Sequence, residues 1–378
     1  MEKTKKILII YATAGIGHKK ASLAIKKAYD EMSLPNVEVA IIDALDYTNN
    51  FFKWSYLQAY LLMVNKLPLF WGMSYYFTDN TFVDIFVSVI RRFNNWLNSK
   101  KLVNYVLDMQ PDVILSTHFF ASEVIADLKT KMVMDSKLIT IITDYRPHAW
   151  WIAEGTDMYV VAGEDTRREL EARKIDPAKI KVMGIPVEPV FSKQLDRPAI
   201  FAKTDLKDDI FTILVIGGGF GVGPIEEIAK VISQIPRNLQ TVVVCGHNEE
   251  LVKKMQALKD ASGMNMKVLS FIDNVYEYME ISDVLISKSG GITVSESLAK
   301  DIPMIVISPI LGQETANCNF LVKNQAAIKV DKLDYLKAVL EDLMSNPYKI
   351  EKLKDCINAV KKPNAAYDVA KLAYEYCK

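Results

Sequence analysis

The segment from Ser287 to Ser297, S-K-S-G-G-I-T-V-S-E-S, combines residue types that suit the binding of a nucleotide diphosphate. It continues an apolar run of strand length, and Gly290 and Gly291 let a ligand approach the backbone without obstruction by side chains. Thr293 is predicted to lie at a helix start, where free backbone N–H groups and the helix dipole attract anions. Glu296, one turn further on, is suited to accept hydrogen bonds from two ribose hydroxyls. The pattern predicts a cradle with a phosphate end and a sugar end.

Two further glycine-rich loops follow predicted strands. The first, T-A-G-I-G-H from Thr13, lacks the third glycine that a dinucleotide fingerprint requires near Lys20, which disfavours a nicotinamide cofactor. The second, G-G-G-F-G-V-G-P from Gly217, has Walker-type glycine spacing but carries Pro224 where the lysine is required, which disfavours a Walker loop. One such loop is most often a tight turn between a strand and a helix, but three of them favour a ligand site.

His18 stands where the first glycine loop becomes a helix, next to Gly17. An imidazole with an ordinary pKa of about 6.5 can accept a proton at neutral pH. A single histidine is more often a surface or capping residue, so its position alone leaves both interpretations open. The sequence makes His18 a candidate general base at the carboxyl end of a strand.

Short apolar runs alternate with helical patterns along both halves of the chain, which is typical of α/β folds with parallel sheets. The predicted strands are 7–12, 37–43, 112–117, 137–144 and 158–162 in the first half, and 211–219, 241–246, 267–272, 283–287 and 302–308 in the second. We therefore expect two Rossmann-like domains that face each other across a cleft, because ligands of such sheets bind at the carboxyl ends of the strands.

The same patterns predict the domain boundaries. We expect an N-terminal domain over residues 1–195, with an aromatic-rich insertion at about 51–98, and a C-terminal domain over residues 208–360. The polar stretch between the domains contains Pro198. Residues 361–378 have a helical pattern, and we expect this last helix to cross back onto the N-terminal domain.

The composition of the chain narrows the class of protein. In its 378 residues, 46 Lys and Arg balance 46 Asp and Glu, which disfavours a nucleic-acid binder that depends on bulk positive charge. The four cysteines show no C-x-x-C spacing and the chain has four histidines, so we expect no metal cluster. The same cysteine pattern predicts a reduced, cytoplasmic compartment. No run reaches the roughly 18 to 20 apolar residues of a membrane span, and the start of the chain lacks the pattern of a signal peptide.

Five motifs, taken in order, resemble glycosyltransferase family 28, most closely its branch of monogalactosyldiacylglycerol synthases and processive diacylglycerol glucosyltransferases. They are T-A-G-I-G-H from Thr13, G-G-G-F-G-V-G-P-I-E-E from Gly217, S-F-I-D-N-V from Ser270, S-K-S-G-G-I-T-V-S-E from Ser287 and G-Q-E-T-A-N from Gly312. The set spans nearly the whole chain, which makes it specific although each motif alone is weak. The resemblance implies a GT-B fold and an inverting enzyme that moves glucose or galactose from a UDP-sugar to diacylglycerol.

The resemblance also implies roles for single residues. His18 is similar to the base that deprotonates the acceptor hydroxyl. The residues that the resemblance assigns to the donor are Gly17, Gly218, Gly219, Gly246, Phe271, Ile272, Asn274, Ser289, Gly290, Gly291, Thr293, Glu296, Gln313 and Glu314. In this set, Gly246, Phe271 and Ile272 surround the uracil, and Ser289 to Thr293 hold the diphosphate. Glu296 holds the ribose, and the pair at 313–314 holds the sugar hydroxyls.

The acceptor side is less well defined. The run I-T-D-Y-R-P-H-A-W-W from Ile142 resembles a T-D-x-x-x-H-x-x-W segment of the family, so Asp144 and His148 are expected to shape the acceptor pocket or to orient His18. A capped loop with an aromatic plug is the alternative. His118, at another strand end, is also assigned to the acceptor side.

No D-x-D sequence occurs, so the metal–diphosphate site typical of another class of sugar transferases is missing. We expect no metal and no other cofactor, with a helix N-terminus stabilising the departing UDP. Two positions depart from the family pattern. Glu188 replaces a basic residue that many relatives carry, which puts a contact to the donor phosphates in doubt, and the Gln313–Glu314 pair differs from the Gln-Gln of a peptidoglycan-precursor transferase.

Residues 51–96 hold fourteen of the 37 aromatic residues of the chain, mixed with Lys and Arg. This composition suits an interfacial helix whose aromatics, among them Trp54, Phe70 and Trp71, enter an anionic membrane surface. An ordinary helical insertion that packs its aromatics into the core is the alternative. We expect a peripheral enzyme on the inner face of the cell membrane.

Other functions remain open at this point. A peptidoglycan-precursor N-acetylglucosaminyltransferase and a UDP-sugar 2-epimerase use a similar donor cradle, and a UDP-sugar sensor without catalysis would not need His18. The sequence does not distinguish glucose from galactose, nor does it give the number of sugars that are added.

Overall fold

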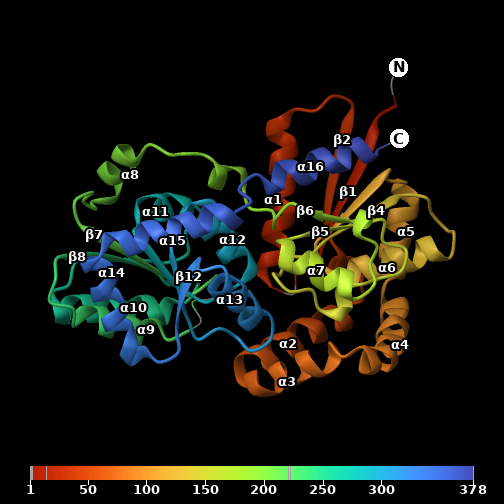
Figure 1. Ribbon diagram of the computed structural model, residues 1–378. Helices are drawn as coiled ribbons and strands as arrows, with labels where there is room; N and C mark the ends of the chain where they lie inside the picture. The colour runs from red at the N-terminus through yellow and green to blue at the C-terminus, as the bar shows by residue number, and fades with distance from the viewer. Residues whose placement is uncertain (1–2, 14, 220, 222, 378) are drawn as a thin grey trace. The chain divides into compact units, whose positions relative to one another are not determined.

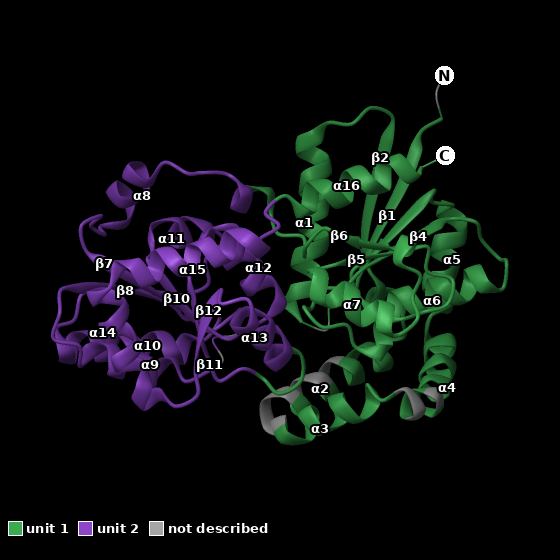
Figure 2. Ribbon diagram, in the orientation of Figure 1, with its two compact units in different colours: residues 1–189, 310–313, 364–378 green, residues 190–309, 314–363 purple. Residues whose placement is uncertain are grey.

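The computed structural model describes residues 3–13, 15–219, 221 and 223–377, and for residues 57, 60, 61, 64–66, 68, 81, 82 and 85 it describes the backbone alone. The chain divides into two compact units (Figure 2). Unit 1 comprises Met1–Pro189, Ile310–Gln313 and Asn364–Lys378, and unit 2 comprises Val190–Pro309 and Glu314–Pro363. The first segment of unit 1 thus extends to Pro189, whereas the sequence pattern placed this boundary at residue 195.

Unit 1 is built on a parallel sheet, which in the described part of the chain has six strands in the order β2-β1-β3-β4-β5-β6 (Figure 1). The strands are β1 (Lys5–Tyr11), β2 (Val37–Asp43), β3 (Val113–Ser116), β4 (Lys137–Ile141), β5 (Met158–Val161) and β6 (Ile180–Val182). The helices are α1 (Ile16–Met32), α2 (Asn50–Lys66), α3 (Pro68–Thr78), α4 (Thr81–Asn98), α5 (Lys100–Met109), α6 (Phe119–Thr130), α7 (Glu164–Ala172) and α16 (Ala365–Tyr376), with 3-10 helices η1 (Ala44–Tyr47), η2 (Ala149–Trp151) and η3 (Pro177–Lys179).

Strand β1 shows why this sheet is covered by helices on both faces. Its central residues are all buried, and their side chains alternate between the two faces. Ile7 and Ile9 join a core cluster with α1 and α16, whereas Leu8 and Ile10 join a second cluster with α5 and α6. The last helix, α16, lies beside α1 (Figure 1), and the Tyr29 hydroxyl donates to the Ala370 carbonyl at 2.6 Å.

Unit 2 repeats this plan with the strand order β12-β11-β10-β7-β8-β9, again parallel and again six strands in the described residues. The strands are β7 (Phe211–Ile216), β8 (Leu239–Val244), β9 (Met266–Leu269), β10 (Val284–Ser287), β11 (Met304–Ile307) and β12 (Ala327–Val330). The helices are α8 (Arg197–Thr204), α9 (Ile225–Ser233), α10 (Glu249–Ser262), α11 (Val275–Ile281), α12 (Gly291–Ala299), α13 (Gln313–Lys323), α14 (Leu336–Ser345) and α15 (Pro347–Val360), with η4 (Pro189–Ser192) and η5 (Leu333–Tyr335).

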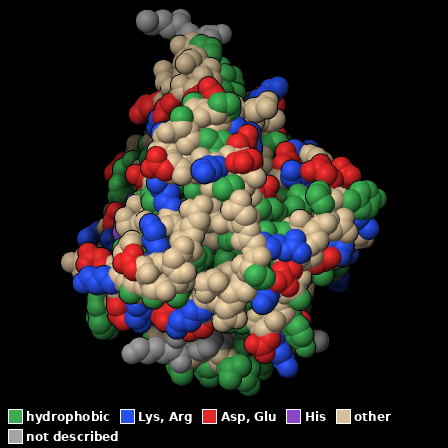
Figure 3. Space-filling model, turned by 90° about the vertical axis from the view of Figure 1, so that its left-hand side faces the viewer, with side chains coloured by type: hydrophobic (Ala, Val, Ile, Leu, Met, Phe, Trp, Pro, Cys, Tyr) green, Lys and Arg blue, Asp and Glu red, His purple; other side chains and the backbone are tan. Residues whose placement is uncertain are grey.

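The prediction of two Rossmann-like α/β domains is confirmed, although each sheet gains one short strand, β6 or β12, that the sequence did not indicate. On the face shown in Figure 3, blue and red side chains are interspersed without a field of one sign. This matches the even balance of 46 basic and 46 acidic residues.

The aromatic-rich insertion forms three consecutive helices, α2, α3 and α4 (Figure 1). Among the described residues, no helix is long and apolar enough to cross a membrane. The insertion is held to the rest of unit 1 by buried charges: Arg91 donates to both carboxylate oxygens of Glu123 on α6, and Asn95 donates to Glu123 at 2.6 Å.

Candidate active site

The loop after β1 places His18 in the first turn of α1, three residues beyond Gly15, whose φ of 141° suits only glycine. The turn is fixed from two sides. Asp43, at the end of β2, accepts hydrogen bonds from the backbone N–H and the hydroxyl of Thr13. The Thr117 hydroxyl, after β3, donates to the carbonyl oxygen of His18 at 3.0 Å. These contacts hold the imidazole at the carboxyl edge of the sheet.

The ring of His18 has a defined tautomer. Its Nδ1 atom lies 2.7 Å from the Thr117 carbonyl oxygen and 3.0 Å from Thr143 Oγ1. Because a carbonyl oxygen only accepts, Nδ1 carries the hydrogen and Nε2 keeps its lone pair. Nε2 makes no hydrogen bond to a described residue.

The surroundings of His18 keep it uncharged at neutral pH. Burial of the ring lowers the pKa of His18 to about 4, and the hydrogen bond to Thr117 only partly opposes this. His118 lies edge-on to His18, with ring centroids 4.5 Å apart, and Trp151 lies at 5.9 Å. Burial, together with the neighbouring His18, also holds the pKa of His118 well below its ordinary value. His118 therefore belongs to the same cluster as His18, where its Nδ1 caps α6 by accepting from Phe120 N.

The other two residues assigned to the acceptor side lie in an adjacent cluster. His148 Nε2 donates to the Tyr75 carbonyl oxygen at 3.0 Å, so His148 fastens α3 to η2 and makes no hydrogen bond to His18 among the described contacts. Asp144 lies near Tyr75. Burial is the main cause that raises the pKa of the Tyr75 phenol, and the negative charges of Asp144 and Asp79 raise this pKa further. Thr143, which sequence reasoning did not single out, is the residue of this segment whose side chain is within hydrogen-bond distance of His18.

In unit 2, the predicted donor loops after β7 and β8 pack against each other. Gly246 has a φ of 61°, and a Cβ atom there would lie 2.5 Å from the Gly219 carbonyl oxygen, so only glycine fits. At Gly218 a Cβ atom would meet nothing within 4 Å, which leaves this side of the loop open. Phe220 and Val222 of the same motif lie outside the described residues.

Phe271 and Ile272 follow β9 and lie close to these loops. Phe271 is exposed and stacks on His247, with ring centroids 4.3 Å apart and an angle of 9° between the planes. Ile272 is half-buried. Asn274 uses its amide to donate to Glu277 at the start of α11, at 2.6 Å. Phe271 and His247 thus offer a flat aromatic surface next to Gly246, and His247 is a residue that sequence reasoning missed.

The segment from Ser289 to Glu296 forms the expected turn from β10 into α12. Ser289 is fully buried and donates to the Glu314 carbonyl oxygen at 2.7 Å, while Asn317 donates to the Ser289 carbonyl oxygen at 3.0 Å. Gly290 is the N-cap of α12, whose first turn holds no acidic residue and no side-chain cap. The first N–H groups of the helix, at Gly291 and its successors, are therefore not used by a cap and suit an anion.

Three further donor residues of unit 2, Thr293, Glu296 and Glu314, lie around this turn. Thr293 is half-buried in the first turn of α12, and Glu296 is buried one turn further on. Glu314 extends over Gly290: a Cβ built there would lie 3.9 Å from Glu314 Oε1. Gln313 belongs to unit 1, where its Oε1 accepts from the indole of Trp71 at 3.2 Å. Among the described residues, no group of three His, Cys, Asp or Glu side chains is placed to hold a metal ion.

Comparison with known structures supports the fold. The crystal structure of MurG from Acinetobacter baumannii has a TM-score of 0.67 and 15% identity, with 98% of this chain and 99% of that chain covered. A UDP co-structure of MnaA from S. aureus has a TM-score of 0.65 and 15% identity, with 98% and 96% covered. At this identity the likeness shows the GT-B fold alone.

Comparison with known sequences identifies the family. Processive diacylglycerol β-glucosyltransferases from Staphylococcus saprophyticus and Bacillus subtilis are 28% and 26% identical, over 98% and 97% of this chain and 92% and 94% of theirs. A family model of monogalactosyldiacylglycerol synthases matches residues 18–187, and that of the glycosyltransferase family 28 C-terminal domain matches residues 212–371. The chain therefore belongs to glycosyltransferase family 28, in the branch of the monogalactosyldiacylglycerol synthases.

Proposed function

We propose that the protein transfers a hexose from a UDP-sugar to diacylglycerol, with inversion at the anomeric carbon, and so makes a β-glycosyldiacylglycerol. The observation that carries this proposal is the fixed tautomer of His18, which leaves Nε2 as a proton acceptor at a strand end. The names of the relatives support diacylglycerol as the acceptor and favour glucose over galactose as the sugar.

His18 is proposed to act as the general base. Its Nε2 takes the proton of the acceptor hydroxyl, the hydroxyl oxygen bonds to the anomeric carbon, and the bond from that carbon to the UDP oxygen breaks. With a pKa of about 4, His18 is neutral but weakly basic at pH 7. The proton therefore moves as the attack makes the hydroxyl more acidic, and not before it.

The cradle of unit 2 is proposed to bind the UDP part of the donor. The N-terminus of α12 faces the diphosphate, and its dipole stabilises the charge that develops as UDP leaves. Glu296 accepts from the ribose hydroxyls, and the surface formed by Phe271 and His247 contacts the uracil. Lys288, half-buried just before Ser289, adds a positive charge at this end of the cradle.

We propose that this chemistry needs no metal ion, since the helix terminus and Lys288 supply the positive potential. Turnover is expected to be the same in EDTA as in buffer with Mg²⁺. A loss of activity in EDTA that added Mg²⁺ restores would contradict this proposal.

The acceptor requires contact with a bilayer, and the insertion α2–α4 is the proposed contact. Trp54 and Phe70 expose 60% and 56% of their surface. Trp71 is half-buried, and its indole N–H donates a hydrogen bond to Gln313. Flotation with anionic vesicles tests this: a variant with Trp54 and Phe70 replaced by Ser is expected to leave the vesicle fraction. Equal flotation of this variant and the wild type would exclude the two residues as anchors.

Product formation tests the reaction itself. The protein is incubated with labelled UDP-glucose or UDP-galactose and dioleoylglycerol, and the organic phase is examined for labelled glycolipid. His18→Ala is expected to lose about a hundredfold or more of the rate, as for loss of a general base, while it still binds UDP. No lipid product from either donor would overturn the proposal, and conversion of a UDP-sugar without lipid would favour an epimerase instead.

A further inference from the structure

Residues 310–313, between β11 and α13, pack closely on helix α3 inside unit 1. Gly72 marks one close approach, because a Cβ atom built there would lie 2.5 Å from Leu311 Cβ. Gly312 marks the other: its φ of 97° favours glycine, and a Cβ atom there would lie 2.9 Å from Tyr75 Cγ. The two glycines therefore let this loop and the helix approach each other more closely than side chains would allow.

A glycine inside a helix needs such a reason. Glycine weakens a helix relative to alanine, because it loses more conformational freedom when the chain folds. Gly72 is buried and is the fifth of the eleven residues of α3. Trp71, Gly72 and Tyr75 share one face of this helix, since residues three and four apart are neighbours. That face is the one that receives the loop.

The packing of the loop ends on the side chain of Gln313. The indole N–H of Trp71 donates to Gln313 Oε1 at 3.2 Å. Because an indole N–H only donates, the amide atom that faces it is the oxygen and not the nitrogen. This contact fixes the orientation of the amide and directs its NH2 group away from Trp71. The NH2 group makes no hydrogen bond to a described residue, so it keeps two donors for a ligand.

Helix α3 is itself held in place, which makes it a suitable support for the loop. Its Tyr75 carbonyl oxygen accepts from His148 Nε2 at 3.0 Å. His148 ends the segment between β4 and η2, and the same segment reaches the proposed base through Thr143. Helix α3 therefore connects Gln313 to the part of unit 1 that supports the base.

We propose that Trp71 is a positioning residue for the donor hexose: it holds the Gln313 amide so that the NH2 group donates to a hydroxyl oxygen of the sugar. This inference rests on the proposed function, since it says how the sugar end of the UDP-hexose is held. The next residue, Glu314, carries a carboxylate that only accepts hydrogen bonds. An amide without the Trp71 contact is free to turn and to present its oxygen to the sugar instead, which removes the donor.

Calorimetry of donor binding tests this role, with whichever of UDP-glucose and UDP-galactose the wild type binds better. W71F keeps an aromatic ring but removes the N–H, and it is expected to weaken binding of the UDP-hexose about fivefold, as for one hydrogen bond. Binding of UDP, which has no hexose, should not change. Equal weakening for both ligands would show a general effect on the fold and overturn the proposal.

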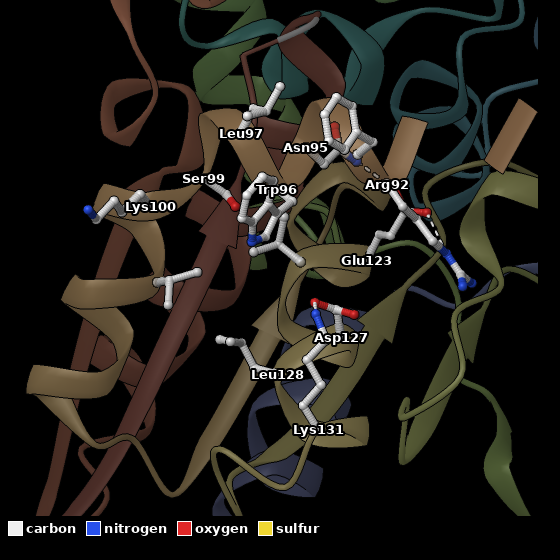
Figure 4. Close-up of a pocket in the computed structure, with 13 residues that line it drawn as sticks. Arg92, Asn95, Trp96, Leu97, Ser99, Lys100, Glu123, Asp127, Leu128 and Lys131 are labelled. Atoms are coloured by element: carbon white, nitrogen blue, oxygen red, sulfur yellow. Dashed lines mark hydrogen bonds and ion pairs between the residues drawn. The ribbon is translucent and has the colours of Figure 1, made fainter. Parts of the chain in front are cut away.

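The matched control is W96F on α4. Trp96 stacks on Phe93 and lines a separate pocket beside Glu123 and Leu128 (Figure 4). This variant makes the same chemical change in the same helical insertion, so it should leave the affinity for the UDP-hexose unchanged. A loss in W96F equal to that in W71F would overturn the proposal.

A double-mutant cycle separates positioning from packing. Q313A removes the amide itself and is expected to weaken binding of the UDP-hexose about fivefold or more. If Trp71 acts through Gln313, W71F/Q313A should bind the UDP-hexose no more weakly than Q313A does. Additive losses would show that Trp71 acts by another route and would overturn the proposal.

The close approach at Gly72 gives a second, steric test. Alanine favours the helix, but in G72A the new Cβ atom meets Leu311 Cβ, which is bonded to the backbone and cannot turn away. G72A should therefore displace the loop and weaken binding of the UDP-hexose but not of UDP, and G72A/L311G should regain part of the loss. M73A, at a residue that is 73% exposed on α3, is the control and should bind normally. Normal binding by G72A would overturn the proposal.

Turnover separates this inference from the proposed function. In W71F, the KM for the donor should rise about fivefold with little change in kcat, because the lost contact holds the bound sugar. A wild type that makes glycolipid, with the same donor KM in W71F, would overturn the role of Trp71 alone. A wild type that binds UDP but neither UDP-hexose would overturn both the role of Trp71 and the proposed function.

Discussion

The Nδ1 atom of His18 lies 2.7 Å from the main-chain carbonyl oxygen of Thr117. This contact uses an acceptor that no substitution at residue 117 removes, so the tautomer of His18 is set by the backbone. The same residue, Thr117, also donates its hydroxyl to the His18 carbonyl oxygen at 3.0 Å. The two residues therefore hold each other in both directions, and the orientation of the base depends on the packing of α1 against the end of β3.

The first prediction concerns the pH dependence of turnover. A histidine base with an ordinary pKa loses half of its activity at about pH 6.5. Because burial lowers the pKa of His18 to about 4, its neutral form persists far below that pH. The kcat of glycolipid synthesis is expected to stay flat from neutral pH down through pH 6.5 and to fall only as the pH approaches 4. A midpoint near 6.5 in kcat would contradict the burial of this ring.

The second prediction concerns stability over the same pH range. The pKa of His18 is about 4 in the folded protein and about 6.5 in the unfolded chain. Between these values the unfolded chain binds more protons, so the free energy of unfolding falls as the pH falls, by up to about 1.4 kcal/mol per pH unit for one proton. Above pH 6.5 the contribution is complete. In urea unfolding, the free energy of unfolding of H18Q should fall less steeply with falling pH than that of the wild type. Equal slopes of this free energy against pH would contradict the prediction.

The third prediction separates positioning from catalysis. Thr143 Oγ1 lies 3.0 Å from His18 Nδ1. The Nδ1 hydrogen of His18 is shared between Thr143 Oγ1 and the carbonyl oxygen of Thr117. Thr143→Val removes this partner, and the loss of one hydrogen bond is expected to lower kcat about fivefold without changing the KM for the donor. Thr143→Ser should restore the rate. Thr140→Val is the matched control, because that hydroxyl donates to Ser122 and does not contact His18.

The fourth prediction separates the two ends of the donor cradle. Glu296 is buried on α12, one turn beyond the helix start that is proposed to bind the diphosphate. Glu296→Gln is expected to weaken UDP binding by about tenfold or more, since a carboxylate acceptor for the ribose is lost. Binding of inorganic pyrophosphate, which has no ribose, should be unchanged in calorimetry. An equal loss for both ligands would show that Glu296 maintains the helix and does not contact the sugar.

Apolar runs predicted ten of the twelve strands in the described sheets, since buried parallel strands are continuously hydrophobic. The two strands that no apolar run indicated lie at one edge of each sheet. β6, Ile180–Val182, is three residues long and includes Lys181, and β12 includes Lys329, so each is too short and too polar to give a signal. The run predicted over 137–144 continues past the end of β4 at Ile141, and this extension brings Thr143 to His18.

Motifs predicted the residues proposed for the cradle, but not the residues that support them. Asn317 is fully buried and donates to the Ser289 carbonyl oxygen, 28 positions earlier in the chain. Thr117 and His18 are 99 positions apart. Such contacts depend on the order of strands in the sheet, which no local pattern encodes. His247 was missed for a different reason, because a single exposed histidine beside a glycine has no distinctive spacing.

The last prediction concerns the link between the helical insertion and the rest of unit 1. Asp79 ends α3, its carboxylate is only 7% exposed, and it accepts from Arg146, Arg173 and the backbone N–H of Ala149. Asp79→Asn leaves Arg173 without a full counter-charge, whereas Arg146 keeps Glu169 as a partner. Because both guanidinium groups are partly exposed, the loss of this charge is expected to cost about 1.5 to 3 kcal/mol, as for a hydrogen bond to a charged group. The midpoint of thermal unfolding of unit 1 should fall, with loss of the near-ultraviolet signal of Trp150 and Trp151 on η2. Asp46→Asn is the matched control, because its pair with Lys53 is exposed and should contribute little; an equal fall in both variants would show that Asp79 has no special role in holding α3.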